Sequence, residues 1–379
     1  MNLKGKILIL GSIDASLRIE LAKNFSKKGF ETIIAGSEEK TIFLNSNIKY
    51  YYFDLSKNLN FFKMIKTIFA IKLIIEKFKP DIVQSFDADI CFYSALACKM
   101  SSYKVNSIAT INGLGRYFST LSIKNIFGRL IYLFTQFLTA RLHHILIFQN
   151  HENKKLFKKF HLCNKKNIRV IYGSGVDFKN QIEFNKKIDN KKSTEVLLVT
   201  RIIKEKGIIE FLKIAENFDK YSKNFSFSLI GGVDEKNKYL KKIIKTYDKR
   251  LSNFKWFGEL RHEQVNSMLS KSDIFLYPSF YSEGIPRVLL EAASHNLYII
   301  SYDMPGCNQI VIDKVNGELI DCDQPLDTFI QSIKNFQNNN DKETKDFNKF
   351  LIKKKFDIEV IADNYLSVYS DIINKRIEK

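Results

Sequence analysis

Short apolar runs alternate with helical patterns along the chain, and this alternation limits its fold more than any other feature. In the first half, the runs typical of strands cover residues 6–10, 32–35, 82–85, 105–111, 145–148 and 169–171. After a polar stretch the alternation starts again, with runs at residues 196–200, 225–230, 254–257, 274–277 and 298–301. Strands that alternate with helices form a parallel sheet whose faces the helices cover. The sequence therefore predicts an α/β protein with two Rossmann-like halves.

The length of the chain also favours two domains. Its 379 residues exceed what one hydrophobic core usually organises. The polar stretch at residues 179–194 predicts a linker between the halves. We expect a first domain over residues 1–180, a second over residues 181–356, and a helix over residues 357–379, where apolar side chains recur at helical spacing.

Positive charge is concentrated in the first half. The whole chain carries a formal net charge of +19. Residues 1–180 contain 28 Lys and Arg against 12 Asp and Glu, which is +16, whereas residues 181–379 contain 32 against 29, which is +3. Such a basic half suits an anionic partner, either a membrane surface or a nucleic acid. A nucleic-acid binder would need aromatic residues among the basic ones on a recognisable module, and the pattern shows none. We therefore expect a membrane surface and no nucleic acid.

The cysteines and the apolar runs indicate the compartment. The five cysteines are odd in number and form no CxxC pair, so neither a disulfide framework nor a zinc site is expected. The apolar run at residues 7–10 is too short for the core of a signal peptide. The chain contains no apolar run of 18 uncharged residues, so we expect no membrane-spanning helix. These features together predict a cytoplasmic protein.

The densest motif lies in residues 273–321. A strand at residues 274–277 is followed by a loop with Glu283 and Gly284, and then by Pro286 and a helix that contains Glu291. A helix start that faces a ligand offers free N–H groups and partial positive charge, which suit a phosphate. Farther upstream, Arg201 and Lys206 follow the strand at residues 196–200, and such cations suit a diphosphate.

This motif resembles the nucleotide-sugar signature of the family 4 retaining glycosyltransferases, especially members that build capsule, O-antigen or lipid-linked glycans. The matching residues are Glu283, Gly284, Pro286, Glu291, Ala292, Asp303, Pro305, Gly306, Cys307, Asn316 and Gly317, together with Arg201, Lys206 and Gly207. The resemblance implies the GT-B fold, in which two Rossmann-like domains face a cleft and a C-terminal helix crosses back onto the first.

The resemblance also implies a role for each matching residue. Arg201 and Lys206 would neutralise the leaving diphosphate, and Glu283 would contact hydroxyls of the transferred sugar. Glu291 would accept hydrogen bonds from the ribose. The remaining donor-binding residues would cradle the phosphates through the loop and the helix start, and they are Gly284, Ile285, Arg287 and Val288. Because Arg201 and Lys206 can replace a metal beside a leaving diphosphate, we expect neither a metal nor another cofactor.

Two segments of the first half point to the acceptor side. Gly11 and Ser12 follow the first strand, although a glycine and a serine there also fit an ordinary turn. Asn112 and Gly113 belong to a segment that resembles an element of the lipid-linked-glycan branch. Many wider relatives carry a histidine near it, and this chain has none there.

The apolar stretch at residues 123–148 allows two interpretations. One is a long buried helix followed by a core strand, and the other is a helix in a membrane interface. Lys124, Arg129 and Arg141 lie within it, together with two histidines. The second interpretation fits the basic first half and a membrane-bound acceptor.

The expected function is transfer of a sugar from a nucleotide diphosphate, such as UDP, to a hydroxyl of a lipid-linked saccharide, with retention. It would take place on the inner face of the cytoplasmic membrane, in the biosynthesis of a surface polysaccharide or glycan. Two alternatives remain, a nucleotide-sugar epimerase of the same fold and a catalytically silent partner protein. The silent partner is kept because Asn308 and Gln309 stand where relatives often have Arg and Glu. A further departure is Asn296 with Tyr298, where relatives usually have Gly and Pro.

Overall fold

The chain forms two compact units. The computed structural model describes residues 4–55, 61–119, 122–178, 193–221, 224–234, 237–336 and 342–377. The first unit comprises Met1–Gly175, Glu283–Ile285 and Phe356–Lys379, and the second comprises Val176–Ser282 and Pro286–Lys355. The boundary expected from the sequence lies five residues beyond Gly175, and most of the expected linker, residues 179–192, lies outside the described residues.

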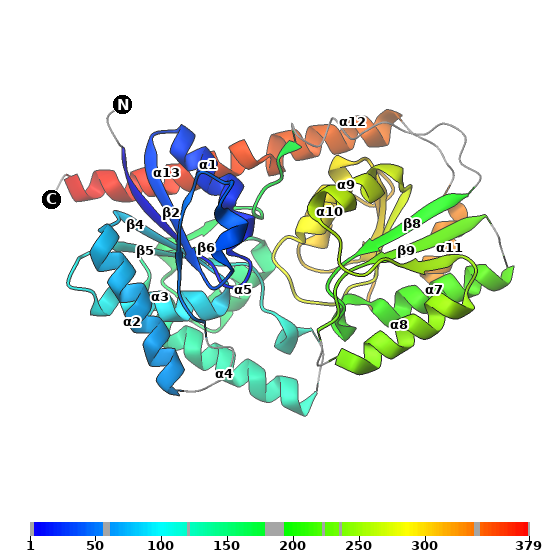
Figure 1. Ribbon diagram of the computed structural model, residues 1–379, viewed down its shortest axis with the longest axis horizontal. Coiled ribbons are helices and arrows are strands. Elements are labelled where there is room, and N and C mark those ends of the chain that lie inside the picture. Colours follow the sequence, from blue (N-terminus) through cyan, green and yellow to red (C-terminus); the bar gives the residue numbers. More distant parts are fainter. Residues whose placement is uncertain are drawn as a thin grey trace. The chain divides into compact units, whose positions relative to one another are not determined.

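A parallel sheet organises the first unit (Figure 1). Its strand order is β3-β2-β1-β4-β5-β6-β7. In chain order the strands are β1 (Gly5–Leu10), β2 (Phe30–Gly36), β3 (Lys49–Tyr52), β4 (Ile82–Phe86), β5 (Asn106–Ile111), β6 (Ile145–Phe148) and β7 (Ile168–Val170). The helices are α1 (Ile19–Lys27), α2 (Phe61–Phe78), α3 (Ala88–Met100), α4 (Ile123–Thr139), α5 (His151–Lys159) and α13 (Ile358–Ile377).

The inner strand β1 shows why the strands of this sheet appear in the sequence as continuous apolar runs. Ile7 and Ile9 pack with residues of α1 and α13 on one face of the sheet. Leu8 and Leu10 pack with residues of α2 and α3 on the other face. A parallel strand that is covered on both faces buries every side chain, so it shows no polar alternation.

The last helix, α13, completes the core of the first unit. Its Tyr369 packs edge-on against Phe25 of α1, with ring centroids 5.5 Å apart, and donates its hydroxyl to Oε1 of Gln84 at 2.9 Å. The Tyr365 hydroxyl lies 3.2 Å from Thr110 Oγ1. The expected C-terminal helix that returns to the first domain is therefore confirmed.

The second unit repeats the architecture with the strand order β10-β9-β8-β11-β12-β13. Its strands are β8 (Thr194–Val199), β9 (Phe225–Ile230), β10 (Phe254–Trp256), β11 (Ile274–Tyr277), β12 (Tyr298–Tyr302) and β13 (Gly317–Ile320). Its helices are α7 (Ile208–Tyr221), α8 (Lys238–Arg250), α9 (His262–Lys271), α10 (Arg287–Ser294), α11 (Leu326–Asn335) and α12 (Lys342–Leu351). The predicted α/β architecture with two Rossmann-like halves is therefore confirmed.

Each sheet has one point where the strand order changes direction. It lies between β1 and β4 in the first unit and between β8 and β11 in the second. The loops that leave the carboxyl ends of such neighbouring strands diverge to opposite faces and leave a crevice for a ligand. The loops after these four strands are therefore where a site is expected.

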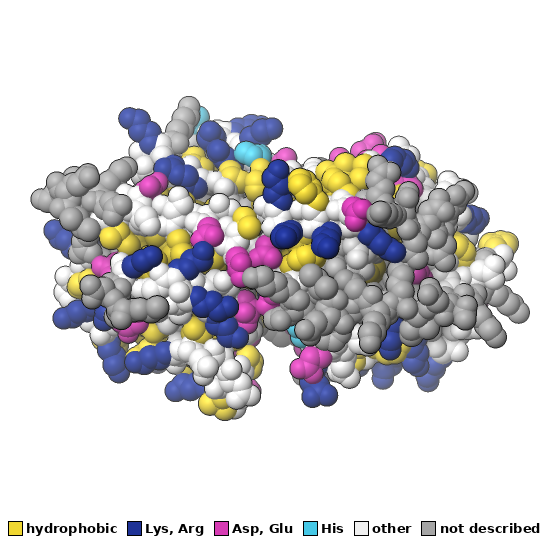
Figure 2. Space-filling model, turned by 90° about the horizontal axis from the view of Figure 1, so that it is seen from above, with side chains coloured by type: hydrophobic (Ala, Val, Ile, Leu, Met, Phe, Trp, Pro, Cys, Tyr) yellow, Lys and Arg dark blue, Asp and Glu magenta, His cyan; other side chains and the backbone are white. Residues whose placement is uncertain are grey.

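The surface gives two further facts. Figure 2 shows a face on which Lys and Arg side chains are interspersed with acidic and apolar ones. Among the residues that the structure describes, no helix combines the length and the apolar character needed to cross a bilayer.

Replacing Tyr365 by alanine should destabilise the protein. The side chain is fully buried between α1 and the sheet, so its loss leaves a cavity and should lower the free energy of unfolding by about 3–5 kcal/mol. Urea unfolding followed by circular dichroism measures the change. Asn364→Ala, one residue earlier on the exposed side of α13, should stay within about 0.5 kcal/mol of the parent chain. Equal losses in both variants would contradict the role given to the buried face.

Candidate functional site

Two basic residues follow β8 at the point where the second sheet changes direction. Arg201 lies two residues beyond the strand and is exposed. Lys206 ends a short 3-10 helix, Lys204–Lys206, and is only 4% exposed. Its Nζ donates to the Tyr277 hydroxyl at 2.8 Å and lies 5.0 Å from the ring centre of Tyr281. A phenol and aromatic rings of this kind hold an ammonium group in a fixed position.

Gly207 fixes the position of this lysine. Its φ of 72° is left-handed, and a Cβ placed on it would lie 2.0 Å from the carbonyl oxygen of Pro278. Only glycine fits such a conformation and such a close approach. The N–H of Phe280 donates to the carbonyl of Glu205 at 3.1 Å. The loop after β8 and the loop after β11 are therefore bound to each other through their backbones.

Helix α10 starts directly after the second of these loops. Pro286 occupies its N-cap position, so the N–H groups of Arg287 and Val288 fall in the first turn, where no intrahelical acceptor exists. Glu291 is largely buried and accepts from Nε of Arg287 at 3.0 Å. The helix ends at Ser294, and Asn296, two residues later, has a φ of 61°, in the left-handed region that asparagine tolerates.

The segment Glu283–Ile285 makes its contacts within the first unit. The carbonyls of Glu283 and Gly284 accept from Nδ2 of Asn150 at 3.2 and 3.0 Å. The N–H of Ile285 donates to Oε1 of Gln149 at 3.3 Å. The N–H of Ile285, which the sequence analysis assigned to a phosphate, therefore already has an acceptor.

Gly284 is required for this contact. A Cβ placed on it would lie 2.2 Å from both the carbonyl oxygen of Asn112 and Oε1 of Gln149. In addition, Gly113 and Glu283 form an isolated antiparallel bridge. The predicted residues Asn112, Gly113, Glu283, Gly284 and Ile285 thus lie together in the first unit. Arg201, Lys206, Arg287, Val288 and Glu291 belong to the second.

A hydrogen-bonded cluster links the loops after β1, β4 and β5. The hydroxyl of Ser12 lies 2.9 Å from Oδ1 of Asp14 and 3.2 Å from Oδ2 of Asp87. Nδ2 of Asn112 donates to Oδ1 of Asp87 at 2.7 Å. Ser12 and its neighbour Gly11 are thus joined to Asn112 through Asp87, which the sequence analysis did not single out.

Asp87 has the features of a strained polar residue. It occupies the N-cap position of α3, but its side chain makes no capping hydrogen bond, and its φ of 68° is left-handed. An aspartate at the N-cap position that makes no capping hydrogen bond loses about 1 kcal/mol of helix stabilisation. Such costs persist only where surrounding contacts outweigh them, and they often mark functional positions.

The two carboxyl groups of this cluster have opposite pKa shifts. Burial, and then the charge of Asp14, raise the pKa of Asp87 to about 7. Burial also works to raise the pKa of Asp14, but the Arg18 guanidinium and the hydrogen bonds of Asp87 and Ser12 hold that pKa below its usual value. Arg18 itself is 3% exposed, and its Nη1 donates to Ser174 Oγ at 2.6 Å.

The departures from the family pattern have partners of their own in the second unit. Nδ2 of Asn308 donates to Oδ1 of Asp303 at 3.0 Å, and Nζ of Lys355 lies 3.5 Å from Oε1 of Gln309. Burial lowers the pKa of Lys355. Among the residues that the structure describes, no group of three His, Cys, Asp or Glu side chains could hold a metal ion.

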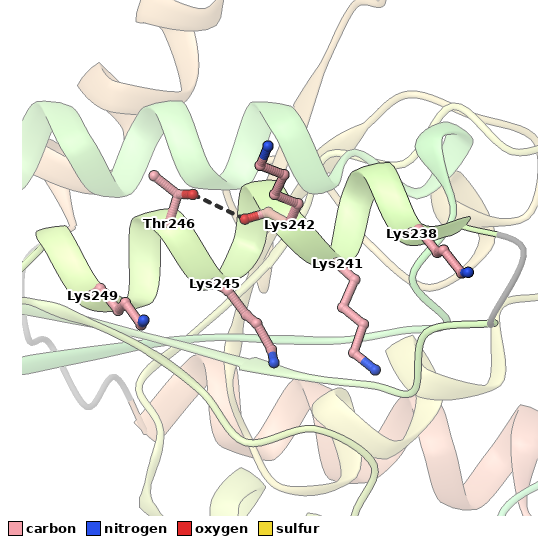
Figure 3. A pocket seen from close by; sticks show the side chains of 6 residues that line it. All are labelled: Lys238, Lys241, Lys242, Lys245, Thr246 and Lys249. Carbon is pink, nitrogen blue, oxygen red and sulfur yellow. Dashed lines mark hydrogen bonds between the residues drawn. The ribbon is translucent and has the colours of Figure 1, made fainter.

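A shallow hollow on α8 lies outside these loops (Figure 3). The side chains of Lys241 and Lys245 point to the same side of the helix, and Thr246 donates to the carbonyl of Lys242 at 3.0 Å. The complete lining is Lys238, Lys241, Lys242, Lys245, Thr246 and Lys249. This row of like charges gives the second unit a basic surface apart from Arg201 and Lys206.

Asp87→Asn should stabilise the protein more at pH 8 than at pH 5. An unfolded aspartate has a pKa of about 3.9, so the stability that protonated Asp87 contributes at low pH is lost as the pH rises towards about 7. The amide cannot ionise and avoids this loss. The difference between variant and parent should therefore grow by about 1–3 kcal/mol between the two pH values. Thermal unfolding at both pH values measures it, and a constant difference would show that Asp87 titrates normally.

Comparisons with known proteins identify the family of the chain. Residues 19–178 match the model of Glycosyltransferase Family 4, and residues 179–354 match that of Glycosyl transferases group 1. An uncharacterised glycosyltransferase of Methanocaldococcus jannaschii is 28% identical over 216 residues, which are 56% of this chain and about half, 54%, of the relative. The UDP-Gal:alpha-D-GlcNAc-diphosphoundecaprenol alpha-1,3-galactosyltransferase of Escherichia coli is 24% identical over 77% of this chain and 76% of its own length.

A solved structure gives the same architecture. Anabaena HepE in complex with UDP and glucose superposes with a TM-score of 0.75 at 14% identity, over 97% of this chain and 100% of its own. This likeness concerns the fold alone. The two family models together cover residues 19–354 and therefore show the family. The chain belongs to the family 4 glycosyltransferases and has the GT-B fold.

Proposed function

We propose that the protein transfers a sugar from UDP to a hydroxyl of a lipid-linked saccharide, with retention of configuration, in the biosynthesis of a surface polysaccharide or glycan. The Escherichia coli relative supports this choice, because its name specifies a UDP-sugar donor and a diphosphoundecaprenol acceptor. The complex of Anabaena HepE with UDP and glucose also supports a UDP-sugar. The reaction would take place at the inner face of the cytoplasmic membrane, where the lipid carrier of the acceptor is located.

The observation that carries the proposal is the placement of Lys206. It is buried at the switch point of the second sheet, and aromatic groups fix its position. A preorganised cation stabilises the negative charge that develops on a leaving diphosphate, and a buried position strengthens this effect. Arg201 would add a second charge from the end of the same strand.

The remaining donor contacts follow from α10. The first-turn N–H groups of Arg287 and Val288 would bind phosphate oxygens, with help from the positive end of the helix dipole. Glu291, held by Arg287, would accept hydrogen bonds from the ribose. The Glu283 side chain would contact hydroxyls of the transferred sugar, while its carbonyl stays bound to Asn150.

Retention is proposed to occur by attack on the same face of the sugar that the diphosphate leaves. The bond between the anomeric carbon and the phosphate oxygen breaks, and a bond from the acceptor oxygen to that carbon forms. The acceptor proton passes to the leaving phosphate, which serves as the base. The protein then stabilises separated charge and supplies no nucleophile of its own.

Lys206→Met should lower kcat/KM for nucleotide release by about 100-fold or more, because it removes the fixed charge and keeps the packing of the stem. The assay uses a panel of UDP- and GDP-sugars with lipid-diphosphate saccharides as acceptors. Lys204→Met is the matched control, since Lys204 is exposed on the same short helix and should keep near-parental activity.

The outcomes of this assay separate the candidate functions. Acceptor-dependent release from one donor, lost in Lys206→Met alone, supports the transferase and names its sugar. Conversion of the donor sugar without an acceptor would indicate an epimerase. Absence of UDP binding by the parent chain, measured by calorimetry, would overturn the donor site and favour a catalytically silent partner.

Chelation of divalent metals should leave the reaction intact. We propose that Arg201, Lys206 and the start of α10 supply the positive charge that a metal provides in other transferases. After dialysis against EDTA, the transfer rate should remain within about twofold of the untreated protein. A rate that falls with EDTA and returns with Mg²⁺ or Mn²⁺ would refute this part of the mechanism.

A further inference from the structure

The amphipathic helix α4 has its apolar side outside. Its buried residues are Asn125, Gly128, Gln136 and Thr139, and Tyr132 and Leu133 beside them pack partly buried against the core of the first unit. Apart from Lys124, the exposed residues are large and apolar, and they are Ile123, Ile126, Phe127, Leu130, Ile131, Phe134, Phe137 and Leu138. A surface helix of a water-soluble domain normally has the opposite arrangement.

This outer side is a continuous stripe. Ile123, Phe127, Leu130 and Phe134 are spaced by three and four residues, so they lie in one row along the helix. Their exposed fractions are 89, 65, 60 and 61%. Contiguous apolar surface of this kind marks a contact with a protein or a membrane.

The position of the helix is fixed by its inner side. The ring of Tyr117 lies over Gly128, where a Cβ would be 2.2 Å from a ring carbon. Nε of Arg129 donates to the carbonyl of Tyr117 at 2.6 Å. Ser122 caps the helix by accepting from the N–H of Asn125 at 3.2 Å. The exposed stripe therefore belongs to a docked helix, which Figure 1 shows at the border of the first unit.

The charges around α4 decide what kind of partner fits. Residues 90–151 contain no Asp or Glu, whereas Lys99, Lys104, Arg116, Lys124, Arg129 and Arg141 all lie within them. Lys124, Arg116 and Arg141 are exposed. An apolar stripe with only positive charges beside it complements the acyl chains and the anionic headgroups of a bilayer.

We propose that α4 lies in the headgroup region of an anionic bilayer, with the stripe from Ile123 to Leu138 turned towards the acyl chains. This inference deepens the function proposed above, and it rests on that function for the membrane as partner. It corrects one interpretation of residues 123–148. The strand β6 is buried as expected, but the helix before it is buried on one side only, because most of its large apolar side chains are exposed.

The test is flotation of the full chain with lipid vesicles. The stripe variant carries the three changes Phe127→Ser, Leu130→Ser and Phe134→Ser. The parent chain should bind vesicles of phosphatidylglycerol and phosphatidylcholine about tenfold more tightly than this variant. The control variant changes three apolar residues of similar exposure on other parts of the chain, and its changes are Leu44→Ser, Tyr221→Ser and Tyr239→Ser. The control variant should bind vesicles like the parent chain. Lys124→Glu should weaken binding to anionic vesicles more than binding to pure phosphatidylcholine.

Other outcomes would overturn the proposal. Equal vesicle binding by the stripe variant and the control variant would overturn it. So would loss of binding in a double variant Lys241→Glu, Lys245→Glu while the stripe variant still binds, because that result would assign the membrane contact to α8. A parent chain that sediments as a dimer and a stripe variant that sediments as a monomer would assign the stripe to a second copy. Transfer to a short, water-soluble diphosphate acceptor should be unchanged in the stripe variant. Loss of vesicle binding with retained transfer therefore separates this inference from the proposed reaction.

Discussion

All strands within each sheet run in the same direction, and the candidate sites depend on this constraint. Parallel strands bring every carboxyl end to one edge, so loops that are far apart in sequence become neighbours. In the second unit this edge unites the loop after β8 with the loop after β11, and Gly207 lets their backbones touch. In the first unit it unites Ser12, Asp87 and Asn112. Neither group of residues could form on a sheet with alternating strand directions.

The sequence predicted those parts of the fold in which local pattern and burial agree. Strands β6 and β11 have the bounds expected from their runs of four consecutive apolar residues. Strand β3, with the sequence Lys-Tyr-Tyr-Tyr, was missed because it lies at the edge of its sheet and has only partly buried side chains. Apolar runs identify strands only when both faces of the strand are covered.

Candidate site residues can be named from the sequence only where they form a spaced motif. Arg201, Lys206 and Glu291 stand in a spaced motif, so they could be named without a structure. Asp87 follows a strand and precedes a helix, where an aspartate is expected as an ordinary cap. Gln149 and Asn150 are likewise polar residues at a strand end, and only folding shows that they bind Glu283–Ile285. For α4, the apolar stretch predicted a helix, either buried or in a membrane interface, but not which side of it faces the core.

The segment Glu283–Ile285 affects how this fold can be divided. The chain passes from the first unit to the second after Gly175, returns for three residues, and leaves again at Pro286 before its final return at Phe356. The second unit thus carries within its own sequence a short piece that completes the first. A recombination event that exchanged residues 176–355 between two relatives would import a foreign piece against Asn112, Gln149 and Asn150. Changes in one half therefore constrain changes in the other, and the second unit is not an independent module that recombination can exchange freely.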